Sequence, residues 1–138
     1  MKAKIISTVL AGMFFVGTVG SAFAVNPRIY KKTEKSDVDN TVATEVYRGE
    51  DDANLVPLAK YVVKYSDEGK AVEKTIYKWN VKEGWTAQLK YVYHYDLSGK
   101  MDALEYAEWD VDKKQWKDNP YLTMYLYTGE GDLLTINE

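Results

Sequence analysis

The stretch His94-Tyr95-Asp96-Leu97-Ser98-Gly99-Lys100 decides the fold of this 138-residue chain. A tyrosine and an acidic residue precede a short segment that ends in glycine, and a lysine follows. Glycine accepts the positive φ angle that a three-residue β-hairpin loop needs at its last position. The stretch therefore predicts two antiparallel strands joined at residues 97–99.

The same pattern recurs along the chain. Related stretches lie at residues 64–70 and 126–132. Gly69 and Gly99 are 30 positions apart, and so are Trp79 and Trp109. Several landmarks that keep one offset indicate an internal repeat.

Each repeat predicts two strands. Segments rich in Tyr, Val, Trp, Thr and Ile alternate with breaks that contain glycine. The expected strands are residues 58–66, 70–81, 85–96, 100–112 and 121–128, with an additional strand at 41–48. The sequence thus predicts an all-β fold, an antiparallel meander of about six to seven strands built from roughly 30-residue two-strand repeats. We expect a curved sheet or an open barrel or sandwich, in which strand 121–128 is buried on both sides because both of its faces are apolar.

Loop lengths predict the register of these strands. With three-residue loops, Ala87 lies between Trp79 and Trp109, and Tyr95 lies opposite Met101. Large side chains then lie beside small ones, as cross-strand packing requires. Odd-numbered residues of neighbouring strands would share one packing face.

The N-terminus has the three parts of a secretory signal peptide. Lys2 and Lys4 precede an apolar run over residues 5–19, and the small-x-small end Ala22-Phe23-Ala24 follows. The run is short for a membrane span, so we expect cleavage after Ala24 and no stable membrane anchor afterwards. No cysteine follows that could carry a lipid. The remaining 114 residues have a net charge of −5 and contain no phenylalanine.

The chain is expected to have three parts. Residues 1–24 are the cleaved signal peptide, 25–40 a flexible N-terminal arm, and 41–138 the β-repeat domain. The arm is expected because residues 31–40 are charged and contain one aliphatic side chain.

Composition excludes several kinds of chemistry. The absence of cysteine rules out disulfides, cysteine-based zinc sites and a cysteine nucleophile. A net charge of −3 does not suit a nucleic-acid binder. The acidic run at residues 50–52 lacks the spacing of a calcium loop, so we expect no metal site and no cofactor. His94 is expected to be a surface residue paired with Asp102.

The aromatic residues are the best candidates for ligand binding. Tyrosine and tryptophan combine flat apolar rings with polar edges, which suits stacking on sugars or anchoring a protein. Tyrosines cluster toward one end of the predicted strands and tryptophans toward the other. The candidate binding residues are Tyr91, Tyr93, Tyr95, Tyr125, Tyr127 and Trp85. The alternative is that these rings fill the core of the domain.

Two other functions stay open. Glu73 and Glu105 are predicted to flank Tyr91 at roughly 10 Å, two strand spacings, near the separation of carboxylates in inverting glycosidases. A small glycoside hydrolase is thus one alternative, although no catalytic constellation stands out. The other is a structural envelope protein that self-associates through an unpaired edge strand.

The repeat also carries a resemblance. The Tyr-x-Tyr-Asp-x-x-Gly-Lys stretch at 93–100, its copy at 64–70, and Trp79 and Trp109 resemble a family of small secreted proteins of Gram-negative gut bacteria, known only as a domain of unknown function. The resemblance covers residues 58–138 and the signal peptide. It implies an all-β repeat fold and export, and it transfers no catalytic residues. The stretch is also similar to the YD repeats of large secreted shell-forming proteins, whose period is shorter.

These observations predict an exported, soluble, unlipidated protein of the periplasm or the cell exterior. We expect a non-enzymatic binding module whose aromatic sheet face takes a protein or a glycan.

Overall fold

The computed structural model describes residues 12–16 and 27–137 of the chain. Its regular elements in these ranges are ten strands. They are β1 (Gly12–Val16), β2 (Arg28–Ser36), β3 (Thr41–Gly49), β4 (Val56–Tyr65), β5 (Ala71–Asn80), β6 (Gly84–Tyr95), β7 (Met101–Asp110), β8 (Gln115–Trp116), β9 (Tyr121–Tyr127) and β10 (Leu133–Asn137).

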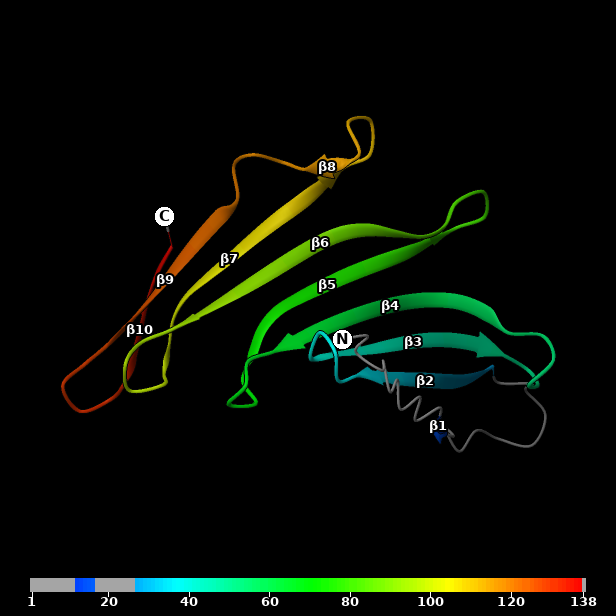
Figure 1. Ribbon diagram of the computed structural model, residues 1–138, viewed down its shortest axis with the longest axis horizontal. Coiled ribbons are helices and arrows are strands. Elements are labelled where there is room, and N and C mark those ends of the chain that lie inside the picture. The colour runs from blue at the N-terminus through cyan, green and yellow to red at the C-terminus, as the bar shows by residue number, and fades with distance from the viewer. Residues whose placement is uncertain (1–11, 17–26, 138) are drawn as a thin grey trace, which may run out of the picture.

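The strands form one antiparallel sheet whose order follows the chain, so the predicted all-β meander is confirmed. The path runs from β1 through β7 to β9 and β10, while the short β8 pairs only with β7. Figure 1 shows the strands side by side in a single layer. The sheet is not closed, because β1 and β10 lie at its two ends.

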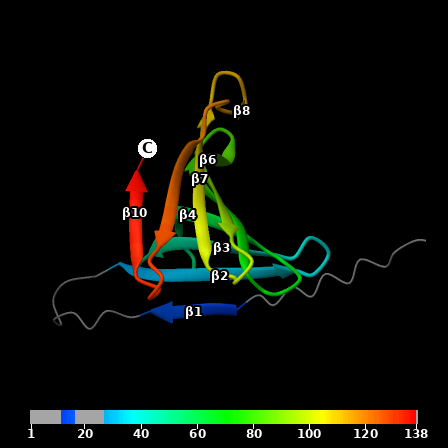
Figure 2. The same ribbon diagram turned by 90° about the vertical axis from the view of Figure 1, so that its left-hand side faces the viewer.

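The sheet is strongly twisted. Adjacent strands normally rotate by roughly 20–25° relative to each other, and this rotation accumulates across a wide sheet. Figure 2 shows the result: β6 and β7 run across the direction of β2 and β3.

Three turns at one edge of the sheet are built alike. The amides of Ser66, Asp96 and Thr128 each donate to the carbonyl four residues later, at 2.8 Å, and the glycine amide inside each turn donates back at 2.9–3.0 Å. The three glycines have φ angles of 81°, 83° and 91°. The predicted glycine loops at 67–69 and 97–99 are therefore confirmed.

Another turn whose last residue has a positive φ angle lies where a flexible arm was expected. Within the expected arm, residues 25–40, Arg28–Ser36 is strand β2, which pairs with β3 along its whole length. Asn40 closes the turn at φ 57°, 29 positions before Gly69, and its carbonyl accepts from the Tyr65 amide at 2.9 Å. Asparagine tolerates this conformation better than most residues. Charged residues suit a strand near the margin of a sheet, so their abundance does not indicate disorder here.

The predicted signal peptide lies largely outside the described residues. Its described part, Gly12–Val16, is strand β1, which pairs with residues 29–33 of β2.

The hairpin between β5 and β6 differs from the predicted register. The Asn80 side-chain oxygen accepts hydrogen bonds from the amides two and three residues later, at 2.8 and 3.2 Å, and so starts the turn one residue early. Asn80 consequently pairs with Gly84, and Trp79 lies opposite Trp85. The predicted position of Ala87 opposite Trp79 is wrong. The side chains of Asp51 and Asp110 accept equivalent bonds in their own loops.

Two β-bulges decide which side chains share a face. The register shifts between Ile76 and Tyr77 in the β5–β6 pair and between His94 and Tyr95 in the β6–β7 pair. Tyr95 lies opposite Met101 as predicted. Between the two bulges, however, odd-numbered residues of β6 lie opposite even-numbered residues of β5 and β7, so the prediction of one odd-numbered face is wrong.

Because directly opposed residues share a face, the pairings define two surfaces. We call them the tyrosine face and the tryptophan face. The tyrosine face carries Tyr61, Tyr91, Tyr106 and Tyr121. The tryptophan face carries Trp79, Trp85, Trp109 and Trp116.

Rings on the tryptophan face supply much of the packing. The Trp79 and Trp85 rings meet edge to face at 5.2 Å, and Trp109 and Trp116 meet in the same way at 5.0 Å. Tyr47 of β3 lies 6.3 Å from Trp85 of β6, although three strand spacings on a flat sheet would measure about 14 Å. The sheet therefore curls toward the tryptophan face at this end.

The core is thin. Among the described residues, no side chain is fully buried, and the most buried apolar residues are Tyr30, Ala103 and Ala107, at 5, 8 and 9% exposure. The expectation that β9 is buried on both sides is wrong. Leu122, Met124 and Leu126 on one face are exposed, and so is Tyr121 at the start of the strand.

A polar network supports the curl. Glu45 accepts hydrogen bonds from the Tyr47 hydroxyl at 2.6 Å and the Lys60 ammonium at 3.1 Å. Burial, together with the bond to Glu45, raises the pKa of Tyr47 to about 12. Burial opposes ionisation of Glu45, but the bonds from Tyr47 and Lys60 outweigh it and lower the pKa of that carboxyl.

Candidate binding face

A row of tyrosines crosses the tyrosine face from β6 to β9. Tyr91 pairs with Tyr106, which pairs with Tyr121. The Tyr106 and Tyr121 rings are stacked, with centroids 4.6 Å apart and planes 12° apart, and Tyr91 lies 6.1 Å from Tyr106. Tyr121 ends the row with 55% of its surface exposed. We call this row the tyrosine ladder.

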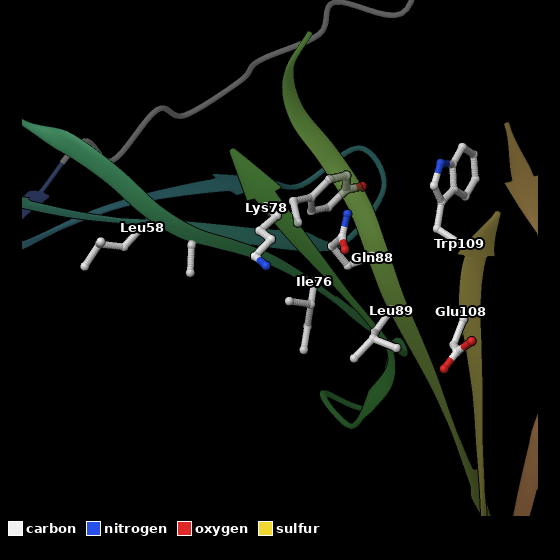
Figure 3. Close-up of a pocket in the computed structure, with 9 residues that line it drawn as sticks. Leu58, Ile76, Lys78, Gln88, Leu89, Glu108 and Trp109 are labelled. Atoms are coloured by element: carbon white, nitrogen blue, oxygen red, sulfur yellow. The ribbon is translucent and has the colours of Figure 1, made fainter. Parts of the chain in front are cut away.

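Beside the ladder lies a shallow groove of about 570 Å³. Ile76 pairs with Leu89, which pairs with Glu108, so the groove crosses β5, β6 and β7 and lies two residues from the ladder on the two strands they share, β6 and β7. Figure 3 shows Leu58, Ile76, Leu89 and Glu108 extending from one side of the sheet, while Trp109 extends from the other. The floor is apolar.

Polar groups flank this floor. Lys78 and Gln88 line the groove, and Lys78 is exposed. Glu108 accepts a hydrogen bond from the Lys117 ammonium at 2.6 Å, which raises the pKa of Lys117. Burial and the neighbouring Tyr121 and Glu108 raise the pKa of Tyr106, so its phenol is neutral at physiological pH. The surface thus combines flat rings, aliphatic side chains and a few hydrogen-bonding groups.

The candidate residues from the sequence do not form one site. Tyr91, Tyr93 and Tyr125 lie on the tyrosine face, where burial and the adjacent tyrosines raise the pKa of Tyr93. Trp85 lies on the opposite face and packs between Tyr47 and Trp79.

Tyr95 and Tyr127 are held by intramolecular contacts at the glycine-turn edge. Their hydroxyls donate to the carbonyl oxygens of Ala71 and Met101, at 2.6 Å in each case. A lysine ammonium also lies 5.1 and 5.0 Å from the two ring centroids. We call each such arrangement a clasp, because it ties one hairpin to the next.

The sequence analysis missed most residues of this surface. Tyr106 and Tyr121 were not singled out, nor were Ile76, Leu89 and Gln88. The even numbers of Tyr106, Ile76 and Gln88 placed them on the face opposite Tyr91 as long as the bulges were unknown. The only signal in the sequence was that aromatic residues recur at similar distances from the ends of neighbouring predicted strands.

The paired glutamates are neighbours across β6, but not on the tyrosine face. Glu73 and Glu105 both pair with Val92, one from each side. They therefore lie on the tryptophan face, and the prediction that Tyr91 lies between them is wrong. The physical reason is the bulge in each hairpin, which moves Tyr91 to the other side of the sheet.

His94 has a different partner from the expected one. Its Nε2 lies 3.6 Å from a Glu105 carboxylate oxygen, whereas Asp102 falls at the bulge. In residues 12–16 and 27–137, no group of three or more His, Asp or Glu side chains is arranged to hold a metal ion. The same part of the chain contains no helix long and apolar enough to cross a membrane.

Solved structures of bacterial proteins share this fold. A DUF3836 family protein from Parabacteroides distasonis is 20% identical with a TM-score of 0.53, over 81% of this chain and 92% of that one. One from Bacteroides vulgatus is also 20% identical at 0.53, over 79% and 98%. A protein with unknown function from Bacteroides fragilis is 15% identical at 0.57, over 80% of each chain. No curated protein matches. The model of the DUF3836 family of unknown function matches residues 1–128, and the chain belongs to that family.

Proposed function

We propose that this protein is an exported, non-enzymatic binding module that takes its ligand, a glycan or a protein, on the tyrosine face. One observation carries the proposal: the stacked pair Tyr106–Tyr121 is open at Tyr121 and adjoins the apolar groove. Stable domains usually cover such a face with a second layer. No described element covers this one.

The ladder and the groove form a continuous surface. They lie two residues apart on each shared strand, which is about 7 Å. From β5 to β9 the surface spans three strand spacings, about 14 Å. An elongated flat ligand, such as an extended oligosaccharide, can contact the rings with its apolar faces and Lys78 or Gln88 with its hydroxyls. A peptide with apolar side chains would use the same features.

A matched pair of variants on β9 tests the face. Tyr121 and Leu122 are adjacent, lie on opposite faces, and are exposed to 55% and 41%. On a glycan array, we expect Tyr121→Ala to weaken a positive signal by about 2 kcal/mol, roughly 30-fold, as for an aromatic anchor. In a solution titration of the monomer, where association through the opposite face has no effect, Leu122→Ala should bind like the unaltered protein.

The outcomes separate the versions of the proposal. Equal binding by both variants would place the site elsewhere. An array without any signal would eliminate glycans and leave a protein ligand. In that case the protein and the same two variants are screened against a peptide library, and the comparison of their binding tests the tyrosine face.

Glycoside cleavage stays a second candidate because Glu73 and Glu105 flank Val92 on the tryptophan face. Two strand spacings, about 9.6 Å, lie at the upper limit of the separation in inverting enzymes. Should hydrolysis of any glycan be detected, Glu73→Gln and Glu105→Gln must each abolish it. Unchanged turnover in either variant would end this candidate.

Export is a proposal that rests on residues 1–24. Cleavage after Ala24 predicts Val25 as the N-terminal residue of the protein recovered from its host. Intact-mass measurement and N-terminal sequencing test this directly, and a retained Met1 would contradict it.

A further inference from the structure

The tryptophan face carries an apolar ridge on β9. Leu122, Met124 and Leu126 alternate along this strand and are exposed to 41, 39 and 46%. Leu122 pairs with Glu105 and Met124 with Ala103, which places the ridge on the face opposite the tyrosine ladder. Such large aliphatic side chains in one row are unusual on a surface that faces only water.

A trough runs beside the ridge. On neighbouring β7 the tryptophan face presents the small side chains Ala103 and Ala107, which are 8 and 9% exposed. Ala107 borders a hollow of about 190 Å³ whose walls include Val92, Trp116 and Pro120. Glu105 lies between these two alanines and pairs with Leu122, so the alanines and the hollow form an interrupted trough beside the ridge.

The charges at the hollow favour an identical partner. Lys90 and Glu105 line it on this face, so both signs are present within one small area, whereas the Lys117 ammonium bonds Glu108 on the tyrosine face. A strongly acidic or basic partner would meet like charges somewhere on this rim. A second copy related by a two-fold axis presents the same mixed set, and each residue can meet its opposite sign.

The available area suits a weak dimer. Four strand spacings by seven residues of strand give a flat footprint of about 450 Å² per copy. Two copies would bury about 900 Å² by this measure, close to the roughly 1,000 Å² at which an interface counts as specific. Sheets pack face to face in this manner at about 10 Å.

We infer that two copies of this chain pack with their tryptophan faces together, each placing its Leu122–Met124–Leu126 ridge in the trough of the other. The contact supplies the missing second layer and leaves both tyrosine faces outward. It is independent of what the tyrosine face binds.

Sedimentation velocity over a concentration series tests the dimer. The purified protein should gain a dimer component as its concentration rises. Met124→Lys should weaken dimerisation at least tenfold, whereas Thr123→Lys, the neighbouring residue on the tyrosine face, should not change it. A protein that stays monomeric at its highest soluble concentration overturns the proposal, and so does an equal response of the two lysine variants.

A larger side chain in the trough distinguishes specific packing of the ridge in the trough from non-specific association. Ala107→Leu adds apolar surface, so non-specific association would strengthen, but specific packing should weaken because the ridge no longer fits. Circular dichroism controls for folding. Leu126→Ser, on an exposed position that folding tolerates, provides a second test and should also favour the monomer. Stronger association in either variant contradicts the proposal.

Discussion

Glycine-to-alanine substitutions in two matched turns should differ in cost. Gly69 and Gly99 occupy the same position in equivalent turns, with φ angles of 81° and 83°. A side chain at such an angle costs roughly 1–2 kcal/mol, partly offset by the stiffer unfolded chain. An added Cβ meets nothing within 4 Å at Gly69, whereas at Gly99 it meets the Lys70 ammonium.

That ammonium belongs to one of the clasps. The Lys70 Nζ donates to the Gly99 carbonyl at 3.1 Å and lies 5.1 Å from the Tyr95 ring centroid. Displacing it forfeits about 0.5–1.5 kcal/mol of hydrogen bonding and about 0.5–1 kcal/mol of cation–π attraction. Gly99→Ala should thus destabilise the protein by about 1–2 kcal/mol more than Gly69→Ala, because the backbone cost cancels between the two turns.

Urea unfolding followed by tryptophan fluorescence measures both variants. The comparison is repeated in a Lys70→Met background, where the clasp is already absent and the difference should shrink to a few tenths of a kcal/mol. Equal destabilisation in the unaltered background, or a difference that persists without Lys70, would refute the clasp as the cause.

Three further outcomes follow from the turns and the polar network. Lys114 has φ 52° in an exposed loop, so Lys114→Gly should raise the urea midpoint by the equivalent of about 0.5–1 kcal/mol. Tyr127→Phe removes the 2.6 Å bond to the Met101 carbonyl and should cost about 1 kcal/mol in the same assay, with no change in the dependence on urea concentration. The pKa of Tyr47 is raised to about 12 in the folded state. Its neutral phenol therefore contributes fully to the free energy of unfolding below pH 10, and this contribution is lost as the pH rises toward 12. Spectrophotometric titration should show Tyr47 among the late-ionising tyrosines, and Glu45→Gln should shift the ionisation of Tyr47 to lower pH.

Local chemistry made the meander predictable. Gly69 and Gly99 each end a tight turn that few other residues allow, and alternating β-branched and aromatic residues indicate strands on either side. The turn at Asn40 was not predicted, because asparagine stands where the other turns have glycine. Strand β2 escaped because its charges resemble those of a disordered arm, and only pairing with β3 makes it regular.

Which residues share the binding face was harder to predict, because the alternation of odd and even positions between the two faces changes at each bulge. A bulge inserts a single residue, and that residue moves every later side chain to the other face. Tyr91 was therefore grouped with Glu73 and Glu105, although its neighbours are Tyr106 and Lys74. The bulges depend on cross-strand geometry, to which Asn80 contributes by starting its turn early, and no residue pattern along one strand encodes that.

The order of the strands has a consequence for how the protein gains and loses structure. Apart from β7 with β9, each main strand pairs only with strands adjacent along the chain. Contact order is consequently low, and folding can begin at any hairpin and propagate to its neighbours, as in solenoid proteins. Amide hydrogen exchange should then show a gradient, slowest near β5 and β6 and faster toward both ends. Shortening the chain from β10 inward should remove protection one hairpin at a time while the central hairpins persist.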